Sequence, residues 1–412
     1  MLKEKERIHG IDLFSNVFSF MPVYSSMGLC ICSCKIRDNR GITIDEINYF
    51  FLRRNDLMNL LLADYSLYDL GDYTKLYFDP SVKIYSYKSG GKISSKLNGA
   101  LVPLLKLLVG EQLIFLYQSD NRILHLHVPK QTNVFMNHGW GTKRSPGILE
   151  MSSKEKVPPW RLLRKRTDYV ICYSDFDSTY FFRHELLDDL PLPKFVPLGH
   201  PRNDFLVRMK DDSKFISEKK KQLGIPEGAK VILFAPTQRE SAICGGTYDE
   251  DILNLHLSEL QEINKFCAER DTYILYRPHY FFKDEVQEKL SNVIFVTAGK
   301  EPDPRPLMLI SDVLITDYSS IFVDYLLLQK PMVFYQPDLE LYQNKLRGLV
   351  IDPNNPVHFP GPKIKKLSDV LDLIPSDFKK FDLQRSRAFF HKYYDDKSME
   401  RLASFIKNIA EL

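Results

Sequence analysis

Four short polar segments of this sequence each follow an apolar run with the length of a buried strand. In the most informative one, Thr316 and Asp317 end such a run, and Ser319 and Ser320 begin a helical pattern. Free backbone N–H groups at the start of a helix, together with two serine hydroxyls, can bind an anion such as a pyrophosphate. The alternative is that Ser319 only caps the helix. Geometry alone does not choose between an anion site and a cap.

Two more polar segments of the second half also follow predicted strands. Arg277 and His279 come directly after one strand, where either could meet a phosphate and His279 could stabilise developing negative charge. Thr237 and Arg239 follow another strand and add a hydroxyl and a guanidinium. Taken singly, the histidine could be structural, and the second segment could be a turn with a surface ion pair. Because the carboxyl ends of parallel strands meet at one edge of a sheet, the three segments together predict a phosphate site.

The fourth segment lies in the first half, where a predicted strand ends at Asn137 and His138. The pKa of a histidine lies close to neutral pH, so His138 could act as a general base toward an incoming hydroxyl. Gly139 and Gly141 flank Trp140 and permit a close approach of the backbone. The alternative is a histidine in the core or in a turn. The segment is therefore a candidate acceptor site.

Strands and helices must place these segments, and the second half of the chain alternates between the two. Strands are predicted at 230–235, 273–277, 293–296, 313–316 and 331–335. Helices are predicted between them at 251–269, 283–290, 305–310 and 319–328. This alternation is typical of parallel βαβ units, and it predicts a doubly wound α/β sheet that binds its ligand at the carboxyl ends of the strands.

The first half follows the same pattern less regularly. Strands are predicted at 82–87, 112–117, 133–136, 168–173 and 192–198, and helices at 42–62 and 177–187. We therefore expect an N-terminal Rossmann-like domain over 1–203, of which 1–80 is helical or irregular, and a linker region over 204–228. A second Rossmann-like domain is expected over 229–390, followed by a C-terminal helix over 391–412.

The composition is that of an ordinary globular protein: 44% of the 412 residues are hydrophobic, 26% are charged and the net charge is +3. Such a small net charge points to no nucleic-acid partner. Cys30, Cys32 and Cys34 alternate as on one face of a strand, and no zinc-spaced histidine or second cysteine pair accompanies them. We therefore expect buried thiols in a reducing cytoplasm and no metal site. Because the start lacks a signal-peptide pattern and Pro22 interrupts the apolar stretch 13–34, we expect a cytoplasmic protein that touches a membrane without crossing it.

The polar segments also match a known family in order along the chain. The matching pieces are Asn137-His138-Gly139, Gly199-His200-Pro201-Arg202-Asn203-Asp204, Ala235-Pro236-Thr237 with Arg239, Arg277-Pro278-His279, Ile315-Thr316-Asp317-Tyr318-Ser319-Ser320, and Asp338-Leu339-Glu340-Leu341-Tyr342 with Arg347-Gly348. In these pieces the chain resembles the CDP-glycerol glycerophosphotransferase family of teichoic-acid and capsule polymerases and primases. Each piece is short, but together they extend over more than half of the chain.

The resemblance implies a GT-B-like fold of two Rossmann-like domains with a crevice between them, in which the first binds the acceptor and the second the donor. It implies that His138 is the base and that His279 contacts the donor phosphates. It also places several residues near the donor: Thr237, Arg239, Arg277, Thr316, Asp317, Ser319, Ser320 and Arg347. On the acceptor side it implies Asn137, Gly139, Lys143 and Arg144. Here the chain reads Trp-Gly-Thr-Lys-Arg where many members have a Pro-Leu-Lys-Lys type of loop, and this departure bears on the identity of the acceptor.

The expected reaction is the transfer of glycerol phosphate, or another polyol phosphate, from CDP-glycerol or CDP-ribitol to a hydroxyl of a cell-surface polymer or its primer. The acceptor would be polyanionic or a lipid-linked glycan. The sequence shows no carboxylate pair or histidine cluster typical of a two-metal site, so no cofactor is required, although magnesium could accompany the donor pyrophosphate. Two alternatives are a nucleotide-sugar glycosyltransferase of the same fold and a non-catalytic protein of surface-polymer assembly.

One stretch of the first half is strongly basic. Residues 143–166 contain eight basic residues, namely Lys143, Arg144, Lys154, Lys156, Arg161, Arg164, Lys165 and Arg166. Only Glu150 and Glu155 oppose them, and Trp160 lies among them. One interpretation is a solvated face. The other is a contact surface for a polyanionic acceptor or an anionic membrane, with Trp160 at the boundary.

Overall fold

The computed structural model describes residues 21–24, 30–37, 43–51, 59–64, 82–87, 113–117, 131–136, 139, 141–148, 151–152, 157–237, 248–278, 290–297 and 300–410. The chain divides into two compact units, Met1–Met58 and Asn59–Leu412.

The first unit contains an antiparallel sheet in the order β1-β2-β3. Its strands are β1 (Met21–Tyr24), β2 (Cys30–Arg37) and β3 (Thr43–Phe51). The three alternating cysteines lie on β2, which confirms the predicted strand. The helix predicted over 42–62 is wrong, because this stretch forms β3 and then β4 (Asn59–Asp64). The β-branched and aromatic residues of β3 suit a strand paired along β2, and this pairing outweighs the helical spacing.

The second unit begins with a six-stranded sheet that is parallel throughout, in the order β5-β4-β6-β7-β8-β9. Its further strands are β5 (Val82–Tyr87), β6 (Leu113–Tyr117), β7 (Gln131–Phe135), β8 (Tyr169–Cys172) and β9 (Lys194–Pro197). These five lie where the sequence predicted them. The predicted acceptor segment therefore directly follows β7.

A second six-stranded parallel sheet has the order β12-β11-β10-β13-β14-β15. Its strands are β10 (Lys230–Phe234), β11 (Thr272–Tyr276), β12 (Val293–Phe295), β13 (Val313–Thr316), β14 (Met332–Tyr335) and β15 (Lys363–Ile364). In chain order this is 3-2-1-4-5-6, the order of a Rossmann sheet. The order reverses between β10 and β13, and ligands of such sheets bind beyond the carboxyl ends at that point.

Helices cover both faces of the second sheet. On one face, α7 (Tyr248–Glu269) packs Leu260, Ile263 and Cys267 against the strands. The other face is covered by α8 (Arg305–Ile310) and by α9 (Ile321–Tyr325), which a 3-10 turn, η5 (Leu326–Leu328), continues. The helices α4 (Pro201–Met209) and α5 (Ser213–Gln222) pack on α8.

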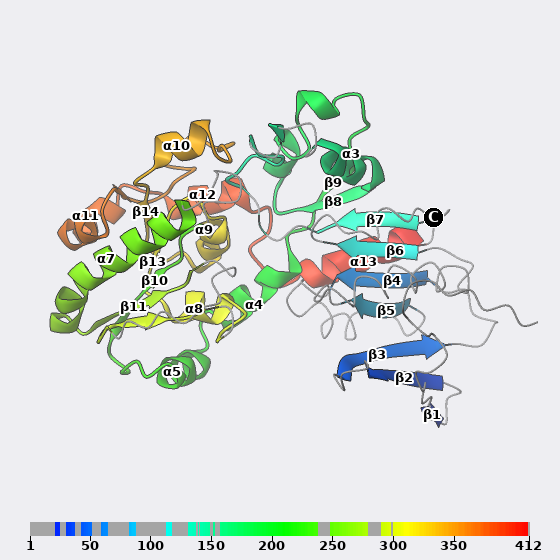
Figure 1. Ribbon diagram of the computed structural model, residues 1–412, viewed down its shortest axis with the longest axis horizontal. Helices are drawn as coiled ribbons and strands as arrows, with labels where there is room; N and C mark the ends of the chain where they lie inside the picture. The colour runs from blue at the N-terminus through cyan, green and yellow to red at the C-terminus, as the bar shows by residue number, and fades with distance from the viewer. Residues whose placement is uncertain are drawn as a thin grey trace, which may run out of the picture. The chain divides into compact units, whose positions relative to one another are not determined.

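The last helix returns to the first six-stranded sheet (β4 to β9), although it follows the second six-stranded sheet (β10 to β15) in sequence (Figure 1). These two parallel sheets are called the first sheet and the second sheet below. This helix, α13 (Ser398–Ala410), buries Met399, Leu402, Ile406 and Ile409 against residues of β6, β7 and β8. Before it, α10 (Leu339–Asn344), η6 (Leu367–Asp372), α11 (Pro375–Phe378) and α12 (Leu383–Phe390) complete the second half. The chain therefore crosses from the second sheet back to the first.

One predicted helix takes a different form. The stretch 177–187 forms two short 3-10 turns, η3 (Asp175–Thr179) and η4 (Glu185–Leu187), and between them Phe182 has a φ of +60°, which a continuous helix does not allow. The linker region expected over 204–228 contains the end of α4 and the whole of α5, which Asp212 caps. The helix predicted over 283–290 lies outside the described residues. Within the described ranges, no helix has the length and apolar character needed to cross a membrane.

Candidate active site

The point where the second sheet reverses its strand order carries two of the predicted site residues. Asp317 follows β13 and is fully buried. Its Oδ1 accepts hydrogen bonds from the backbone N–H groups of Thr237 (2.8 Å), Tyr318 (2.6 Å) and Ser319 (3.3 Å). Thr237 follows β10, so a single carboxylate oxygen fixes the ends of both central strands. Asp317 thus shapes the floor of the predicted donor site.

More polar groups of the segment between β13 and α9 are already hydrogen-bonded within the protein than the sequence predicted. The Thr316 hydroxyl donates to the carbonyl oxygen of Ala235 at 2.7 Å, and the Ser319 hydroxyl accepts from the N–H of Ile321 at 3.4 Å. With two further N–H groups bound to Asp317, the expectation of free N–H groups is wrong at three positions of this turn. The α-helical part of α9 is also only five residues long. An anion here would therefore be held by the serine side chains more than by the helix terminus.

Arg277, which follows β11, has its guanidinium inside the protein. It donates to the carbonyl oxygens of Val296 (3.2 Å), Thr297 (3.1 Å) and Pro302 (3.1 Å), and also to that of Glu301. These bonds use the guanidinium to hold Val296, Thr297, Glu301 and Pro302 beside the sheet edge. A role of Arg277 at the donor phosphates stays a prediction, and in this arrangement it would act by supporting the neighbouring loop.

The loop after β7 crosses to the second half of the chain. The Thr142 hydroxyl, which is buried, donates to the carbonyl oxygen of Tyr318 at 2.9 Å. The backbone of this loop then pairs with a segment near the end of the family match. Its bonds are Val350 N–H to Thr142 O (3.0 Å), Arg144 N–H to Gly348 O (3.1 Å) and Ile148 N–H to Arg347 O (3.1 Å). Residues predicted on the acceptor and donor sides are therefore neighbours.

Gly139 brings this loop against the start of α9. Its φ of +150° favours glycine, and a Cβ placed there would lie only 2.5 Å from the Ser320 hydroxyl oxygen. The predicted acceptor segment and the predicted phosphate-binding segment, 181 residues apart in sequence (320 minus 139), thus touch each other. This contact makes the two segments parts of one site.

Three basic side chains surround the paired backbone segments. Arg144 is exposed, whereas Lys143 and Arg347 are partly buried. A Cβ placed at Gly348 would lie 3.1 Å from Cδ of Arg144, and one at Gly147 would lie 3.2 Å from Nε of Arg347. The two arginines therefore lie over glycine backbone, and together with Lys143 they place positive charge along the paired segments 142–148 and 347–350.

Four predicted site residues lie outside the described residues. They are Asn137, His138, Arg239 and His279. Their sequence neighbours Met136, Gly139, Thr237 and Pro278 are described and follow β7, β10 and β11. The roles of the two histidines remain predictions.

Residues 114–408 match the family described as CDP-glycerol:poly(glycerophosphate) glycerophosphotransferase. The match includes every segment assembled above. The chain belongs to this family.

Relatives of the chain include enzymes of teichoic acid synthesis. It is 37% identical over 269 residues to the teichoic acid poly(glycerol phosphate) polymerase of Bacillus spizizenii, which covers 63% of this chain and 65% of that protein. It is 33% identical over 211 residues to the teichoic acid glycerol-phosphate transferase of Staphylococcus aureus, which covers 51% of each. The chain therefore spans between about half and two thirds of the length of these two relatives.

Solved structures similar to this chain share its fold. The wall teichoic acid polymerase TagF gives a TM-score of 0.63 at 19% identity, covering 86% of this chain and 88% of that chain. UDP-GlcNAc 2-epimerase from Neisseria meningitidis gives a TM-score of 0.53 at 11% identity, covering 85% of this chain and all of that chain. The chain thus has the GT-B-like fold that the sequence predicted.

Two residues that hold the loop after β7, Tyr180 and Asp177, were not predicted from the sequence. The Tyr180 hydroxyl accepts a hydrogen bond from the N–H of Gly141 at 2.9 Å and also interacts with Asp177. Asp177 is buried, and its Oδ2 accepts from the N–H groups of Tyr173 (2.6 Å) and Ser174 (3.1 Å). Burial raises the pKa of Asp177 to about 7. The aromatic run around Tyr180 resembles ordinary core, so the sequence carried no signal for this role.

The family segment 199–204 also supplies a structural carboxylate. Asp204 accepts hydrogen bonds from the N–H groups of Ser398 (3.0 Å) and Met399 (2.9 Å), so it caps the helix that returns to the first sheet. Burial raises the pKa of Asp204 to about 6. The position of this segment in the family order was the signal that could have identified it.

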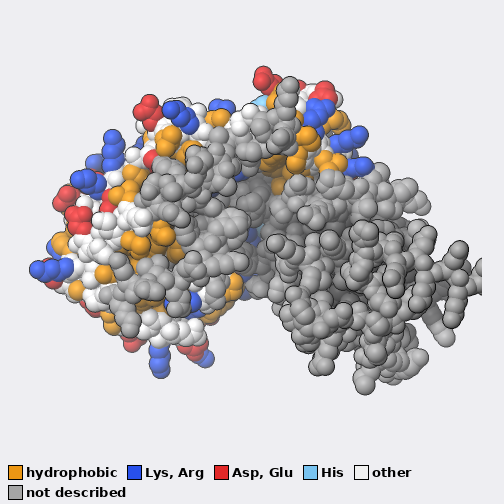
Figure 2. All heavy atoms as spheres, in the orientation of Figure 1, with side chains coloured by type: hydrophobic (Ala, Val, Ile, Leu, Met, Phe, Trp, Pro, Cys, Tyr) orange, Lys and Arg blue, Asp and Glu red, His pale blue; other side chains and the backbone are white. Residues whose placement is uncertain are grey.

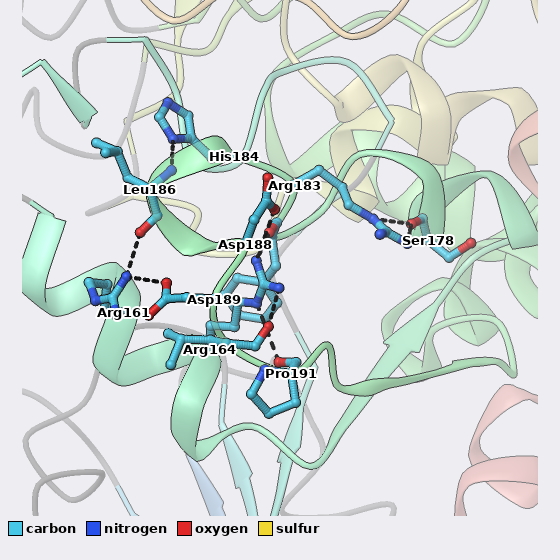
Figure 3. Close-up of polar contacts among 11 residues, drawn as sticks. Arg161, Arg164, Ser178, Arg183, His184, Leu186, Asp188, Asp189 and Pro191 are labelled. Atoms are coloured by element: carbon cyan, nitrogen blue, oxygen red, sulfur yellow. Dashed lines mark hydrogen bonds and ion pairs between the residues drawn. The ribbon is translucent and has the colours of Figure 1, made fainter.

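The basic stretch 143–166 differs from the predicted contact surface. In α3 (Val157–Arg166), the Arg161 guanidinium binds Asp189 (2.6 Å) and the carbonyl oxygen of Leu186 (2.7 Å) (Figure 3). Arg164 is buried and donates to the carbonyl oxygens of Phe182 (2.9 Å), Leu190 and Pro191 (3.3 Å). These two arginines therefore hold the turn that follows η4.

Trp160 is partly buried, and its predicted place at a membrane boundary stays a prediction. Its ring packs edge-on against Phe181 and Phe182, with centroids 6.4 and 6.0 Å away, because the apolar face of α3 covers the first sheet. Lys165 remains exposed. On the face drawn in Figure 2, the described Lys and Arg side chains are interspersed with Asp and Glu. A contact of the remaining basic residues with an anionic surface stays a prediction.

Metal ligands do not gather in the described part of the chain, where no group of three or more His, Cys, Asp or Glu side chains could hold an ion. The side chains of the three cysteines on β2 lie outside what the structure describes. The expectation that the chain needs no cofactor stays a prediction.

Proposed function

We propose that the chain transfers glycerol phosphate, or another polyol phosphate, from a CDP-polyol to a hydroxyl of a teichoic-acid type polymer or its primer. The contact of Gly139 with Ser320 carries this proposal, because it joins the acceptor and donor segments of the family in one site. A reaction that needs two substrates side by side requires such a junction.

In the proposed reaction the acceptor hydroxyl attacks the β-phosphorus of the donor. The new bond joins the acceptor oxygen to that phosphorus, while the bond to the bridging oxygen breaks and CMP leaves with the electron pair. His138 takes the proton of the attacking hydroxyl. His279, together with Ser319 and Ser320, stabilises the charge that develops on the phosphates, and in-line attack keeps the entering and leaving oxygens apart.

The positive charge near the site suits both substrates. Arg144 lies beside Gly348, and Arg347 lies beside Gly147 on the loop that also carries Gly139. A polyol-phosphate chain and the donor pyrophosphate would both be anionic. A magnesium ion, if it takes part, would accompany the donor pyrophosphate. A lipid-linked acceptor at the inner face of the cell membrane is part of the same proposal, and Lys143, Arg144 and Lys165 are the residues that would attract an anionic surface.

The test is a panel of donors. Purified protein is incubated with CDP-glycerol, CDP-ribitol, UDP-GlcNAc or CMP-sialic acid and a short polyol-phosphate acceptor. CMP release is followed, and the products are examined by mass spectrometry. We expect CMP release and extension of the acceptor by polyol phosphate units with a CDP-polyol only. Sugar transfer from a nucleotide sugar would replace the proposal with a glycosyltransferase, and donor binding without turnover on any acceptor would replace it with a non-catalytic protein.

A further inference from the structure

The family segment Gly199-His200-Pro201-Arg202-Asn203-Asp204 has no role in the proposed chemistry, yet it contacts both halves of the site. His200 is buried at the start of α4. Its Nδ1 accepts the N–H of Arg202 at 3.3 Å, so the ring proton lies on Nε2, which donates to the carbonyl oxygen of Met136 at 3.0 Å. Met136 is the last described residue before Asn137 and His138. His200 therefore fixes the start of the loop that carries the predicted base.

Arg202 reaches the other half of the site. It forms an ion pair with Asp324, whose side chain is 5% exposed, while that of Arg202 is 14% exposed. The Tyr173 hydroxyl donates to Asp324 at 2.8 Å. Asp324 comes four residues after Ser320, so the two lie on one side of the short helix. The guanidinium also flanks Gly139, since a Cβ placed there would lie 3.6 Å from its Nη2.

We propose that Arg202, held by Asp324, is a positioning residue that sets the His138 loop relative to the serines at the start of α9. The Arg202–Asp324 ion pair, with the hydrogen bond from Tyr173 to Asp324, fixes the orientation of the guanidinium. An apolar contact of the same size would not fix an orientation. Gly139 has no side chain with which to fix its own place. Because transfer rates depend steeply on the placement of the reacting groups, this pair acts on the rate without touching substrate. The inference rests on the proposed function.

Arg202→Lys is the main test, because it keeps the charge but replaces the guanidinium whose Nη2 binds Asp324. A Tyr173→Phe variant removes only the hydroxyl that donates to Asp324. It is included because Asp324→Asn would leave Arg202 charged and buried, which lowers stability. Arg208→Gln is the matched control: Arg208 lies on the same helix and pairs with Asp396 at 3.3 Å on the surface. The readouts are kcat per folded protein, the Kd for CDP-glycerol and the pH profile of kcat.

We expect kcat of Arg202→Lys to fall roughly a hundredfold, that of Tyr173→Phe to fall less, and that of Arg208→Gln to stay unchanged. The Kd for CDP-glycerol and the acidic limb of the pH profile should stay where they are. An unchanged kcat in both variants would overturn the assignment. A loss of donor affinity equal to the loss of rate would make Arg202 a donor ligand, and a shifted acidic limb would make it an electrostatic modulator of the base. Wild-type turnover is measured first, since its absence would contradict the proposed function and this inference with it.

Discussion

The two sides of the site are held in different ways. On the donor side, the strand ends organise themselves: Asp317 binds the N–H groups of its own turn and of Thr237, and Thr316 binds the neighbouring strand end. On the acceptor side, the loop after β7 is held from elsewhere, by Tyr180 at Gly141 and by the bond from Thr142 to Tyr318. The contacts of the donor side therefore lie within the second half, whereas the acceptor loop is held both by its own half, through Tyr180, and by the second half, through Tyr318.

This difference predicts which changes affect chemistry and which affect folding. Changes on the acceptor side should act mainly on the rate, because residues outside the loop after β7 determine where this loop lies. Changes on the donor side should act on stability and donor binding together, because the same hydrogen bonds serve both.

A large effect on the rate is expected at Gly139. In Gly139→Ala, the new methyl group would meet the Ser320 hydroxyl and push the loop away, so turnover should fall by roughly a hundredfold or more. Gly228→Ala is the control, because a Cβ there has no neighbour within 4 Å. Steady-state CMP release with CDP-glycerol measures both. Wild-type turnover in Gly139→Ala would show that the loop does not approach Ser320 in the working enzyme.

The donor side is tested at Asp317. Asp317→Ala leaves three backbone N–H groups without their acceptor, so the free energy of unfolding should fall by roughly 3 kcal/mol and donor binding should weaken with it. Asp312 precedes β13 at the opposite edge and accepts a single bond, from the N–H of Val231 at 2.8 Å. Asp312→Ala should cost about 1 kcal/mol and leave donor binding alone. Urea unfolding measures the stability of the two variants, and calorimetry measures their donor binding. Equal effects of the two variants would contradict the role of Asp317 in organising the donor site.

The support beneath the acceptor loop should depend on pH. Burial raises the pKa of Asp177 to about 7, so the folded state holds the proton more tightly than the unfolded state. The stability that this group contributes is complete below the unfolded pKa, near 3.8, and is lost as pH rises through about 7. Relative to Asp177→Asn, wild type should lose roughly 2–3 kcal/mol of unfolding free energy between pH 5 and 8. Parallel pH profiles of the two proteins would mean that Asp177 is ionised throughout.

The smallest effect is expected at Gln336, which directly follows β14. It is buried, and neither atom of its amide has a hydrogen-bond partner among the described residues. Gln336→Leu should therefore raise the free energy of unfolding by about 1 kcal/mol. In Gln343→Leu, the control, the N–H of Leu349 would lose its acceptor at 3.0 Å, and stability should fall. A loss of stability in Gln336→Leu would show that water or a rearrangement satisfies the amide.

The same difference explains what the sequence could predict. The strands of the second sheet and the residues at their ends follow from local apolar runs and the polar residues after them, so β10, β11, β13 and β14 were placed within one or two residues. The match of segments in family order identified the acceptor loop. That the N–H groups of the α9 turn are already taken by Asp317 could not be predicted, because a carboxylate can equally well face solvent.

Contacts between distant parts of the chain were beyond the sequence argument. Arg164 looks like one of a basic cluster, and only the folded turn shows that three carbonyl oxygens surround its guanidinium. The packing of Trp160 against Phe181 and Phe182 likewise appears only in the folded chain. The strand β3 was predicted as a helix because its spacing fits both, and pairing with β2 decided the outcome.

Separating donor binding from turnover in two variants tests the division of the site into acceptor and donor sides. Calorimetry with CDP-glycerol and CMP release with an acceptor are measured on His138→Ala and on Ser319→Ala/Ser320→Ala. We expect His138→Ala to bind the donor as wild type does but to lose turnover by roughly a hundred- to ten-thousand-fold. The double serine variant should lose donor affinity and rate together, because the pyrophosphate is bound in both the ground and transition states. Loss of donor affinity in His138→Ala with its rate at saturation intact, or an unchanged affinity in the serine variant, would contradict the division of the site into acceptor and donor sides.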